Sequence, residues 1–153
     1  MDHLYIAQKG FVYSKNRKQI LVIRYSDAKY TSDKVKGKLG LPGGKMAFGE
    51  NPNSSFIREV EEETGITIKA GGPFHIYTWT YPREMDFVQI VAVARVGYFL
   101  KGNIHKISVE EKESKISEVK WINIKEIQIK DFISDEQPVI KKFLEYSKIN
   151  SFT

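Results

Sequence analysis

Residues 43–66 read GGKMAFGENPNSSFIREVEEETGI, a glycine-rich loop followed by a segment with helix signals at both ends. Asn51 can cap a helix, and Pro52 suits the first helical position, where its missing N–H has no partner to lose. Gly65 suits the left-handed residue that follows a last helical turn. The sequence therefore predicts a helix from Pro52 to Thr64.

Three carboxylates gather on one side of this predicted helix. At about 100° per residue, Glu59, Glu62 and Glu63 fall within an arc of about 100°. Like charges at i,i+4 cost roughly 0.2–0.5 kcal/mol, and the helix dipole disfavours anions in the last turn. Arg58 offsets part of this repulsion by pairing with Glu62. The arc is explained either as a solvated acidic face or as a site for a hard divalent cation, which prefers oxygen ligands.

The spacing of these residues resembles the signature of the Nudix hydrolase family. From Gly44 the chain has five residues, Glu50, seven residues, Arg-Glu, an aliphatic residue, one residue, Glu-Glu, one residue, Gly and an aliphatic residue. Each defined position of the signature is filled, namely by Gly44, Glu50, Arg58, Glu59, Val60, Glu62, Glu63, Gly65 and Ile66. Fixed spacing over so many positions is far more specific than a lone glycine-rich loop.

Length and composition fit one globular domain. The chain has 153 residues, of which 41% are hydrophobic and 28% charged, so we expect a single domain over residues 1–153. We find neither an apolar run of about 18 residues nor a secretory signal, and we expect a cytoplasmic protein. The absence of cysteine excludes disulfides, a thiolate nucleophile and cysteine–zinc sites.

The net charge of +5 raises the question of nucleic-acid binding. The basic residues are scattered and form no continuous stripe, so a lysine-rich solvated surface is the favoured interpretation. A phosphorylated small molecule would also be attracted to such a surface. We therefore expect a small-molecule nucleotide as partner, no membrane and no nucleic acid, and a homodimer is compatible with the sequence.

Alternating and continuous apolar patterns predict the strands. The predicted strands are 5–13, 19–25, 39–42, 66–68, 74–81, 87–100 and 118–122. Residues 5–13 and 19–25 are expected to form a hairpin, as are 74–81 and 87–100. The Gly71-Gly72-Pro73 triplet is expected to end the strand that starts at Ile66. The nearly continuous apolar run 87–100 indicates a central strand buried on both faces.

The C-terminal part of the chain is predicted to be helical. Residues 123–130 are expected to form a short helix. Ser134 begins a further helix, with Gln137 at the spacing of a capping box. These patterns alone indicate an α+β domain of uncertain topology. The resemblance implies more: an α/β fold of Nudix type, an α/β/α sandwich with a mixed β-sheet between helices.

The resemblance also implies the chemistry of the site. Glu59, Glu62 and Glu63 are the expected metal ligands, with the Gly43 carbonyl as a further ligand and one glutamate as general base. The expected cofactor is Mg²⁺, with Mn²⁺ as an alternative. Arg58 would orient a glutamate through a charge-assisted bond. Glu50 would support the loop or hold a second metal.

Residues outside the signature are expected to contribute to the site. A base in the loop before Trp121 is common in the family, and Glu113 is slightly favoured over Glu110 and Glu111. Arg24 is either a phosphate ligand or a surface arginine. The side chains that alternate along residues 77–81 provide either a stacking wall for a base or core packing; they are Tyr77, Trp79 and Tyr81.

The family hydrolyses nucleoside diphosphates linked to another moiety, and three functions follow. The first is Mg²⁺-dependent hydrolysis of a nucleoside diphosphate derivative. Pro82, sixteen residues after Ile66, resembles ADP-ribose-cleaving members, but its neighbours Tyr81 and Arg83 depart from the context usual there, and a turn proline is the favoured interpretation. The second is a sanitising pyrophosphohydrolase of modified nucleoside triphosphates. The third is a non-catalytic nucleotide-sensing or RNA-binding Nudix domain, against which the complete glutamate set argues.

Overall fold

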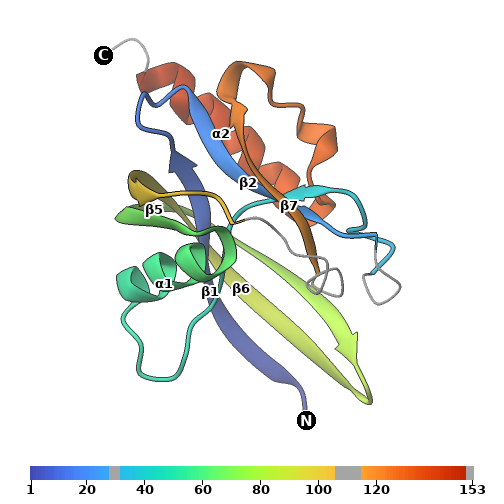
Figure 1. Ribbon diagram of the computed structural model, residues 1–153. Helices are drawn as coiled ribbons and strands as arrows, with labels where there is room; N and C mark the ends of the chain where they lie inside the picture. The colour runs from blue at the N-terminus through green and yellow to red at the C-terminus, as the bar shows by residue number, and fades with distance from the viewer. Residues whose placement is uncertain (28–31, 106–114, 151–153) are drawn as a thin grey trace.

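The computed structural model describes residues 1–27, 32–105 and 115–150. Its strands are β1 (His3–Tyr13), β2 (Gln19–Tyr25), β3 (Leu39–Gly40), β4 (Gly43–Lys45), β5 (Ile66–Arg83), β6 (Asp86–Gly102) and β7 (Ile116–Asn123). Its α-helices are α1 (Pro52–Thr64) and α2 (Gln137–Asn150), and three 3₁₀ turns lie between β7 and α2, namely η2 (Ile124–Glu126), η3 (Ile129–Asp131) and η4 (Ser134–Glu136). Figure 1 shows their arrangement.

The strands form one mixed sheet of seven strands, in the order β3-β2-β1-β6-β5, with β4 also paired to β1 and β7 to β2. The pairing of β1 with β6 is parallel and extends from His3 opposite Val88 to Tyr13 opposite Tyr98. The other pairings are antiparallel. The predicted hairpin of β1 and β2 is present where Tyr13 faces Ile20, and the strands then take different partners.

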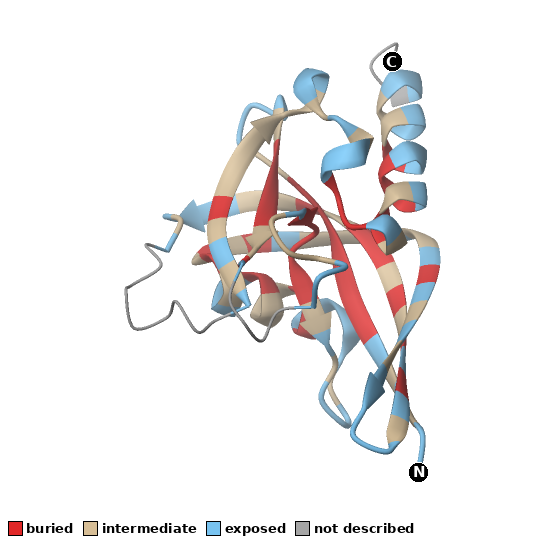
Figure 2. Ribbon diagram, turned by 90° about the vertical axis from the view of Figure 1, so that its right-hand side faces the viewer, coloured by how far each residue is buried: buried red, intermediate tan, exposed pale blue. Residues whose placement is uncertain are grey.

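Two apolar cores lie on opposite faces of the sheet. Val12 and Leu21 face α1 and pack with its Phe56, whereas the preceding residues on each strand face α2 and pack with Phe143. Successive strand residues point to opposite faces, so β1 and β2 supply both cores. Figure 2 shows the buried residues along the strands between the two helices. The predicted α/β/α sandwich is confirmed.

Helix α1 has the boundaries that its sequence predicts. The Asn51 side chain accepts hydrogen bonds from the backbone N–H of Asn53 at 2.9 Å and of Ser54 at 3.4 Å. Gly65 ends the helix with a φ of 82° and donates its N–H to the Glu61 carbonyl. The apolar side of the helix is thereby fixed against the sheet, and its carboxylates face the loop that precedes it.

Strands β5 and β6 differ from the prediction. Gly71-Gly72-Pro73 does not end a strand, because β5 runs on to Arg83 and absorbs the triplet through register shifts at residues 70–75, as a β-bulge does. The predicted turn at residues 82–86 is correspondingly shorter. Strand β6 is central but is not buried on both faces: Val88 and Ile90 are buried, while Gln89 between them is exposed. Figure 1 shows the reason, since this end of β6 extends beyond α1.

The C-terminal prediction is also corrected. Ser134 lies in the 3₁₀ turn η4, and α2 begins only at Gln137, whose Nε2 donates to the Phe132 carbonyl at 3.0 Å. Residues 123–130 contain 3₁₀ turns and not one short helix. The predicted strand 39–42 is shortened to β3, since Pro42 has no N–H for a continuous ladder, and β4 follows in the stretch predicted to be a turn. Among the described residues, no helix is long and apolar enough to cross a membrane.

Candidate active site

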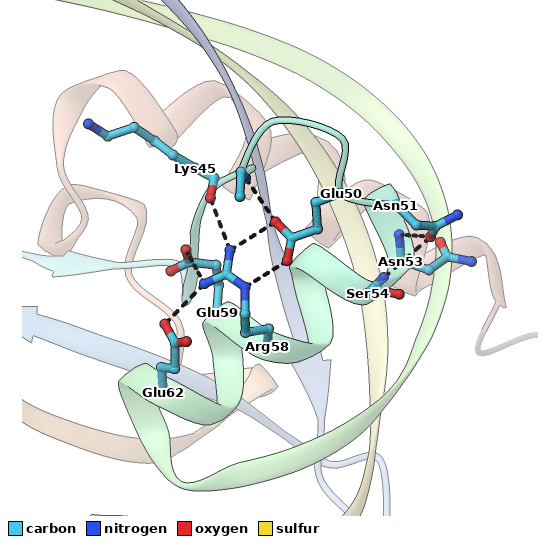
Figure 3. Close-up of polar contacts among 9 residues, drawn as sticks. Lys45, Glu50, Asn51, Asn53, Ser54, Arg58, Glu59 and Glu62 are labelled. Carbon is cyan, nitrogen blue, oxygen red and sulfur yellow. Dashed lines mark hydrogen bonds and ion pairs between the residues drawn. The ribbon is translucent and has the colours of Figure 1, made fainter.

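Arg58 is the centre of the polar contacts on α1 (Figure 3). Its Nε lies 2.6 Å from Glu50 Oε1 and its Nη2 lies 3.0 Å from Glu50 Oε2. Its Nη1 donates to Glu59 at 2.9 Å and to Glu62 at 3.1 Å, so the predicted pairing with Glu62 is present. One guanidinium therefore holds two carboxylates of the acidic arc and ties both to Glu50.

Glu50 joins this arginine to the loop. Its Oε2 accepts the backbone N–H of Ala47 at 2.8 Å. The hydrogen bonds from Arg58, followed by the one from Ala47, lower the pKa of Glu50 from 4.5 to about 2. Glu50 was predicted either to support the loop or to hold a second metal, and these contacts agree with support of the loop.

The two glycines of the loop allow the glutamates of α1 to approach the backbone. A Cβ on Gly44 would lie 2.4 Å from Glu59 Oε2, and a Cβ on Gly43 would lie 2.2 Å from the carbonyl oxygen of Gln8. Gly43 has a φ of 130° and donates its N–H to Glu63 Oε1 at 3.1 Å. The backbone of β4 thus lies in direct contact with the side chains of Glu59 and Glu63.

Glu63 occupies a less polar position than its neighbours on the arc. Burial raises the pKa of its carboxyl to about 7, although the Lys9 ammonium and the Gly43 N–H oppose this shift. Glu62, in contrast, is exposed. The three predicted ligands therefore lie on one side of α1 in different environments, and each already accepts a hydrogen bond from the protein.

A cavity of about 640 Å³ opens beside this loop. Glu59 and Glu63 line it together with the predicted aromatic residues Trp79 and Tyr81. Tyr77 has a different role, because it is buried and its hydroxyl donates to Glu136. Trp79 and Tyr81, adjacent to each other on one face of β5, therefore form an aromatic wall of the cavity, and Tyr25 and Pro82 also belong to its lining.

Arg24 lies in a different place. It lines a second cavity, of about 330 Å³, together with Lys36, Lys38 and Lys120. Its Nε lies 3.1 Å from Glu118 Oε2, and its Nη1 donates to the Gly37 carbonyl at 2.9 Å. The structure thus does not bring Arg24 to the cavity that contains the glutamates. The predicted base Glu113, and its alternatives Glu110 and Glu111, lie outside the described residues.

One buried ion pair was not predicted. Lys9 Nζ lies 3.4 Å from Glu136 Oε2, and their side chains are 7% and 0% exposed. Lys9 also lines the larger cavity. The signal for it was available, because a lysine interrupts an otherwise uncharged strand in the segment IAQKGFV. Its partner could not be found in this way, since it lies at the start of the C-terminal helical region.

The carboxylates of α1 are the candidate ligands of a divalent cation. Among residues 1–27, 32–105 and 115–150, no group of three His, Asp or Glu side chains is arranged to hold a metal, and the carboxylates of α1 accept hydrogen bonds from Arg58 and from the Gly43 N–H. The donors are nevertheless all oxygens, and Gly44 leaves Glu59 Oε2 against the loop without a Cβ between them. This donor set fits a hard cation.

Comparison with known proteins identifies the family. The family model described as NUDIX domain matches residues 7–143. The chain belongs to the Nudix hydrolase family. Nudix hydrolases generally use a divalent metal, which agrees with the oxygen donors of α1.

The Nudix relatives differ in their named substrates. The chain is 33% identical to an 8-oxo-dGTP diphosphatase of Escherichia coli K12 over 54% of this chain and 59% of the relative. It is 29% identical to an ADP-ribose pyrophosphatase of Bacillus subtilis over 60% of this chain and 43% of the relative. These matches thus span less than two thirds of either relative. The structure of a MutT protein from Methanosarcina mazei superposes with a TM-score of 0.68 at 21% identity, covering 95% of this chain and 96% of that one.

Proposed function

We propose that this Nudix protein is a Mg²⁺-dependent hydrolase that cleaves the diphosphate linkage of a nucleoside diphosphate derivative such as ADP-ribose. One observation carries the proposal: Glu59 and Glu63 line the same cavity as Trp79 and Tyr81. Carboxylates suit a metal that binds a diphosphate, and an aromatic wall suits a base. The volume of about 640 Å³ is in the range of small-molecule sites.

In this proposal the metal is held by Glu59, Glu62 and Glu63 with the Gly43 carbonyl. A bound divalent cation supplies charge stabilisation for the diphosphate and lowers the pKa of water. Arg58 holds Glu59 and Glu62 close together on the helix and orients them through charge-assisted bonds. Glu50 in turn fixes Arg58, so the loop and the helix keep one geometry.

The same cavity supports a second candidate, the hydrolysis of modified nucleoside triphosphates. The observation in its favour is the similarity to the 8-oxo-dGTP diphosphatase of E. coli, at 33% identity. The two candidates differ in their products. A nucleoside diphosphate derivative gives two monophosphates, whereas a nucleoside triphosphate gives a nucleoside monophosphate and pyrophosphate.

A substrate panel tests both candidates. Purified protein is incubated with nucleotide sugars, dinucleotides, and ordinary and oxidised nucleoside triphosphates in Mg²⁺ or Mn²⁺, and the products are separated by chromatography. We expect two monophosphates from one member of the first class. The Glu59→Gln, Glu62→Gln double variant is the control for contaminating hydrolases. If the wild type turns over none of the panel, the proposal is wrong.

A further inference from the structure

The floor of the cavity carries a buried ammonium group that the proposed hydrolysis does not use. Lys9 lies on β1, where it faces Gly43 across the pairing with β4. Its Nζ is 5.5 Å from the centroid of the Trp79 ring, and both residues line the cavity. Lys9 therefore shares the cavity with Glu59 and Glu63 and lies beside the ring of Trp79.

The counterion of this ammonium is closed off from the cavity. Glu136 is wholly buried and does not belong to the cavity lining. Its Oε1 accepts the backbone N–H of Leu41 at 2.9 Å, and its Oε2 accepts the hydroxyl of Tyr77 and faces Lys9. Both oxygens of this carboxylate are engaged, so the pair presents only its cationic member to a ligand.

The ammonium has bonding capacity left for a ligand. It carries three N–H donors. Within the described residues, its contacts with Glu136 and with the Tyr25 hydroxyl account for two. Burial by itself lowers the pKa of Lys9, but the combined attraction of Glu136, Tyr25 and Glu63 outweighs this effect, so the pKa is raised and the group stays charged.

Stability alone does not explain the pair. Bringing an ammonium and a carboxylate out of water costs about as much as their attraction returns, and apolar pairs of similar size are often equally stable. The apolar neighbours of Lys9 in the same core, such as Ala7 and Phe11, show that this part of β1 accepts apolar side chains. A contact between the Lys9 ammonium and a bound ligand would explain why a charged residue occupies this position.

We propose that Lys9 is a ligand-binding residue that donates to an acceptor oxygen of the nucleotide, with Glu136 as the positioning residue that holds its ammonium. The inference rests on the proposed nucleotide site and adds a preference to it. The acceptor is either a phosphate oxygen or a keto oxygen of a base stacked on Trp79. If the contact is to the keto oxygen of a base, guanine is favoured over adenine, which carries an amino group at that position, and the preferred substrate is then a guanine nucleotide instead of ADP-ribose.

The test measures binding by calorimetry in the absence of divalent metal. The variant is Lys9→Met, Glu136→Gln, which removes both charges together and so avoids an unpaired buried carboxylate. We expect its affinity for GMP to fall by about tenfold or more, as loss of a charge-assisted hydrogen bond predicts. The matched control is Lys101→Met, an exposed lysine of β6, which should bind GMP as the wild type does.

Guanosine and ribose 5-phosphate distinguish the two sources of the oxygen. Weaker binding of guanosine with unchanged ribose 5-phosphate supports a contact to the base. Weaker binding of ribose 5-phosphate with unchanged guanosine supports a contact to the phosphate. If the folded double variant binds GMP as tightly as the wild type, or if the wild type binds none of the three compounds, the inference is overturned.

Two further measurements distinguish loss of ligand binding from loss of folding and from loss of catalysis. Should the double variant not fold, Lys9→Gln replaces it, because the amide still reaches Glu136 but carries no charge; an unaltered GMP affinity there also overturns the inference. Hydrolysis is assayed separately with Mg²⁺. A protein that hydrolyses nothing yet loses GMP affinity on substitution of Lys9 contradicts the proposed hydrolase and supports the role of Lys9.

Discussion

Arg58 and Glu50 form a two-pronged ion pair across the turn that joins the glycine-rich loop to α1, with N···O distances of 2.6 and 3.0 Å. The remaining Nη1 of the same guanidinium reaches two glutamates of the acidic arc. A lysine could not make this set of contacts, because a planar guanidinium offers five donors in fixed directions whereas an ammonium is a point charge. The pair thus links loop position to carboxylate position.

This ion pair predicts an acid-dependent loss of stability. Arg58 lowers the folded-state pKa of Glu50 from 4.5 to about 2, so the unfolded chain binds the proton more readily. The stabilisation is therefore complete above pH 4.5 and is lost as the pH falls through about 2. Thermal melts across this range should show a steeper decline for the wild type than for Glu50→Gln. Glu61→Gln, an exposed position of the same helix, should behave as the wild type; equal slopes in all three proteins would contradict the prediction.

Two adjacent glycines should respond differently to alanine. In Gly43→Ala the new Cβ meets the backbone of Gln8 at a φ of 130°, so we expect a loss of about 1–3 kcal/mol in the free energy of unfolding. In Gly44→Ala the Cβ meets only the end of the Glu59 side chain, which can move. That variant should keep most of its stability and lose most Mg²⁺-dependent turnover. Urea titrations and kinetics on both variants test this, and a fully active Gly44→Ala would refute it.

Metal should stabilise the folded protein. A cation that binds the folded site and not the unfolded chain adds about 2.7 kcal/mol at a hundredfold excess over Kd. Mg²⁺ or Mn²⁺ should therefore raise the Tm of the wild type, and the Glu59→Gln, Glu62→Gln variant should lose most of that rise. NaCl at matched ionic strength only screens charge and should do less. Equal responses to MgCl₂ and NaCl in both proteins, with no heat in a metal titration, would show that the free protein has no such site.

Trp79 should affect substrate binding more than turnover. It is half-buried, lines the cavity and stacks on Tyr77 with the ring centroids 5.7 Å apart. Trp79→Ala should raise KM more than it lowers kcat, because stacking far from the reacting phosphorus is largely uniform binding. The loss in the free energy of unfolding caused by Trp79→Ala should be smaller than the roughly 3–5 kcal/mol expected for removing a tryptophan from a core.

The other tryptophan supplies the control. Trp121 packs edge-on against Phe99 in the core on the α1 side of the sheet and does not line the cavity. Trp121→Ala should therefore lower the Tm without a selective rise in KM. A Trp79→Ala protein that is as stable as the wild type and has the same KM would rule out both stacking and packing roles for Trp79.

Local signals predicted the helix and its carboxylates well. Asn51 and Gly65 fix the ends of α1 through contacts with residues two to four positions away, so no distant partner is needed. The arc of glutamates follows from helical periodicity once those ends are known. The Gly71-Gly72-Pro73 triplet shows the limit of local signals, because pairing with β6 overrides the propensity of these residues to break a strand.

Long-range partners could not be read from the chain. Nothing around Arg24 indicates that Glu118 and the Gly37 carbonyl will hold it away from the glutamates. Tyr77 and Trp79 are both aromatic and alternate along the same strand, so the sequence does not separate their roles. They differ in the structure because the Tyr77 hydroxyl donates to the buried carboxylate of Glu136. The side chains that decide these roles come from other elements of the fold, and a single sequence does not record such pairings.

The parallel pairing of β1 with β6 bears on how the protein is made. During synthesis β1 leaves the ribosome well before β6, and Lys9 well before Glu136. Burying a lysine without its counterion is unfavourable, so we expect Lys9 of the nascent chain to remain in water until Glu136 has been synthesised. Contacts between such distant parts of a chain also form slowly. The strand that carries Lys9 is therefore translated first, but its ion pair can form only after η4, which contains Glu136, has been synthesised.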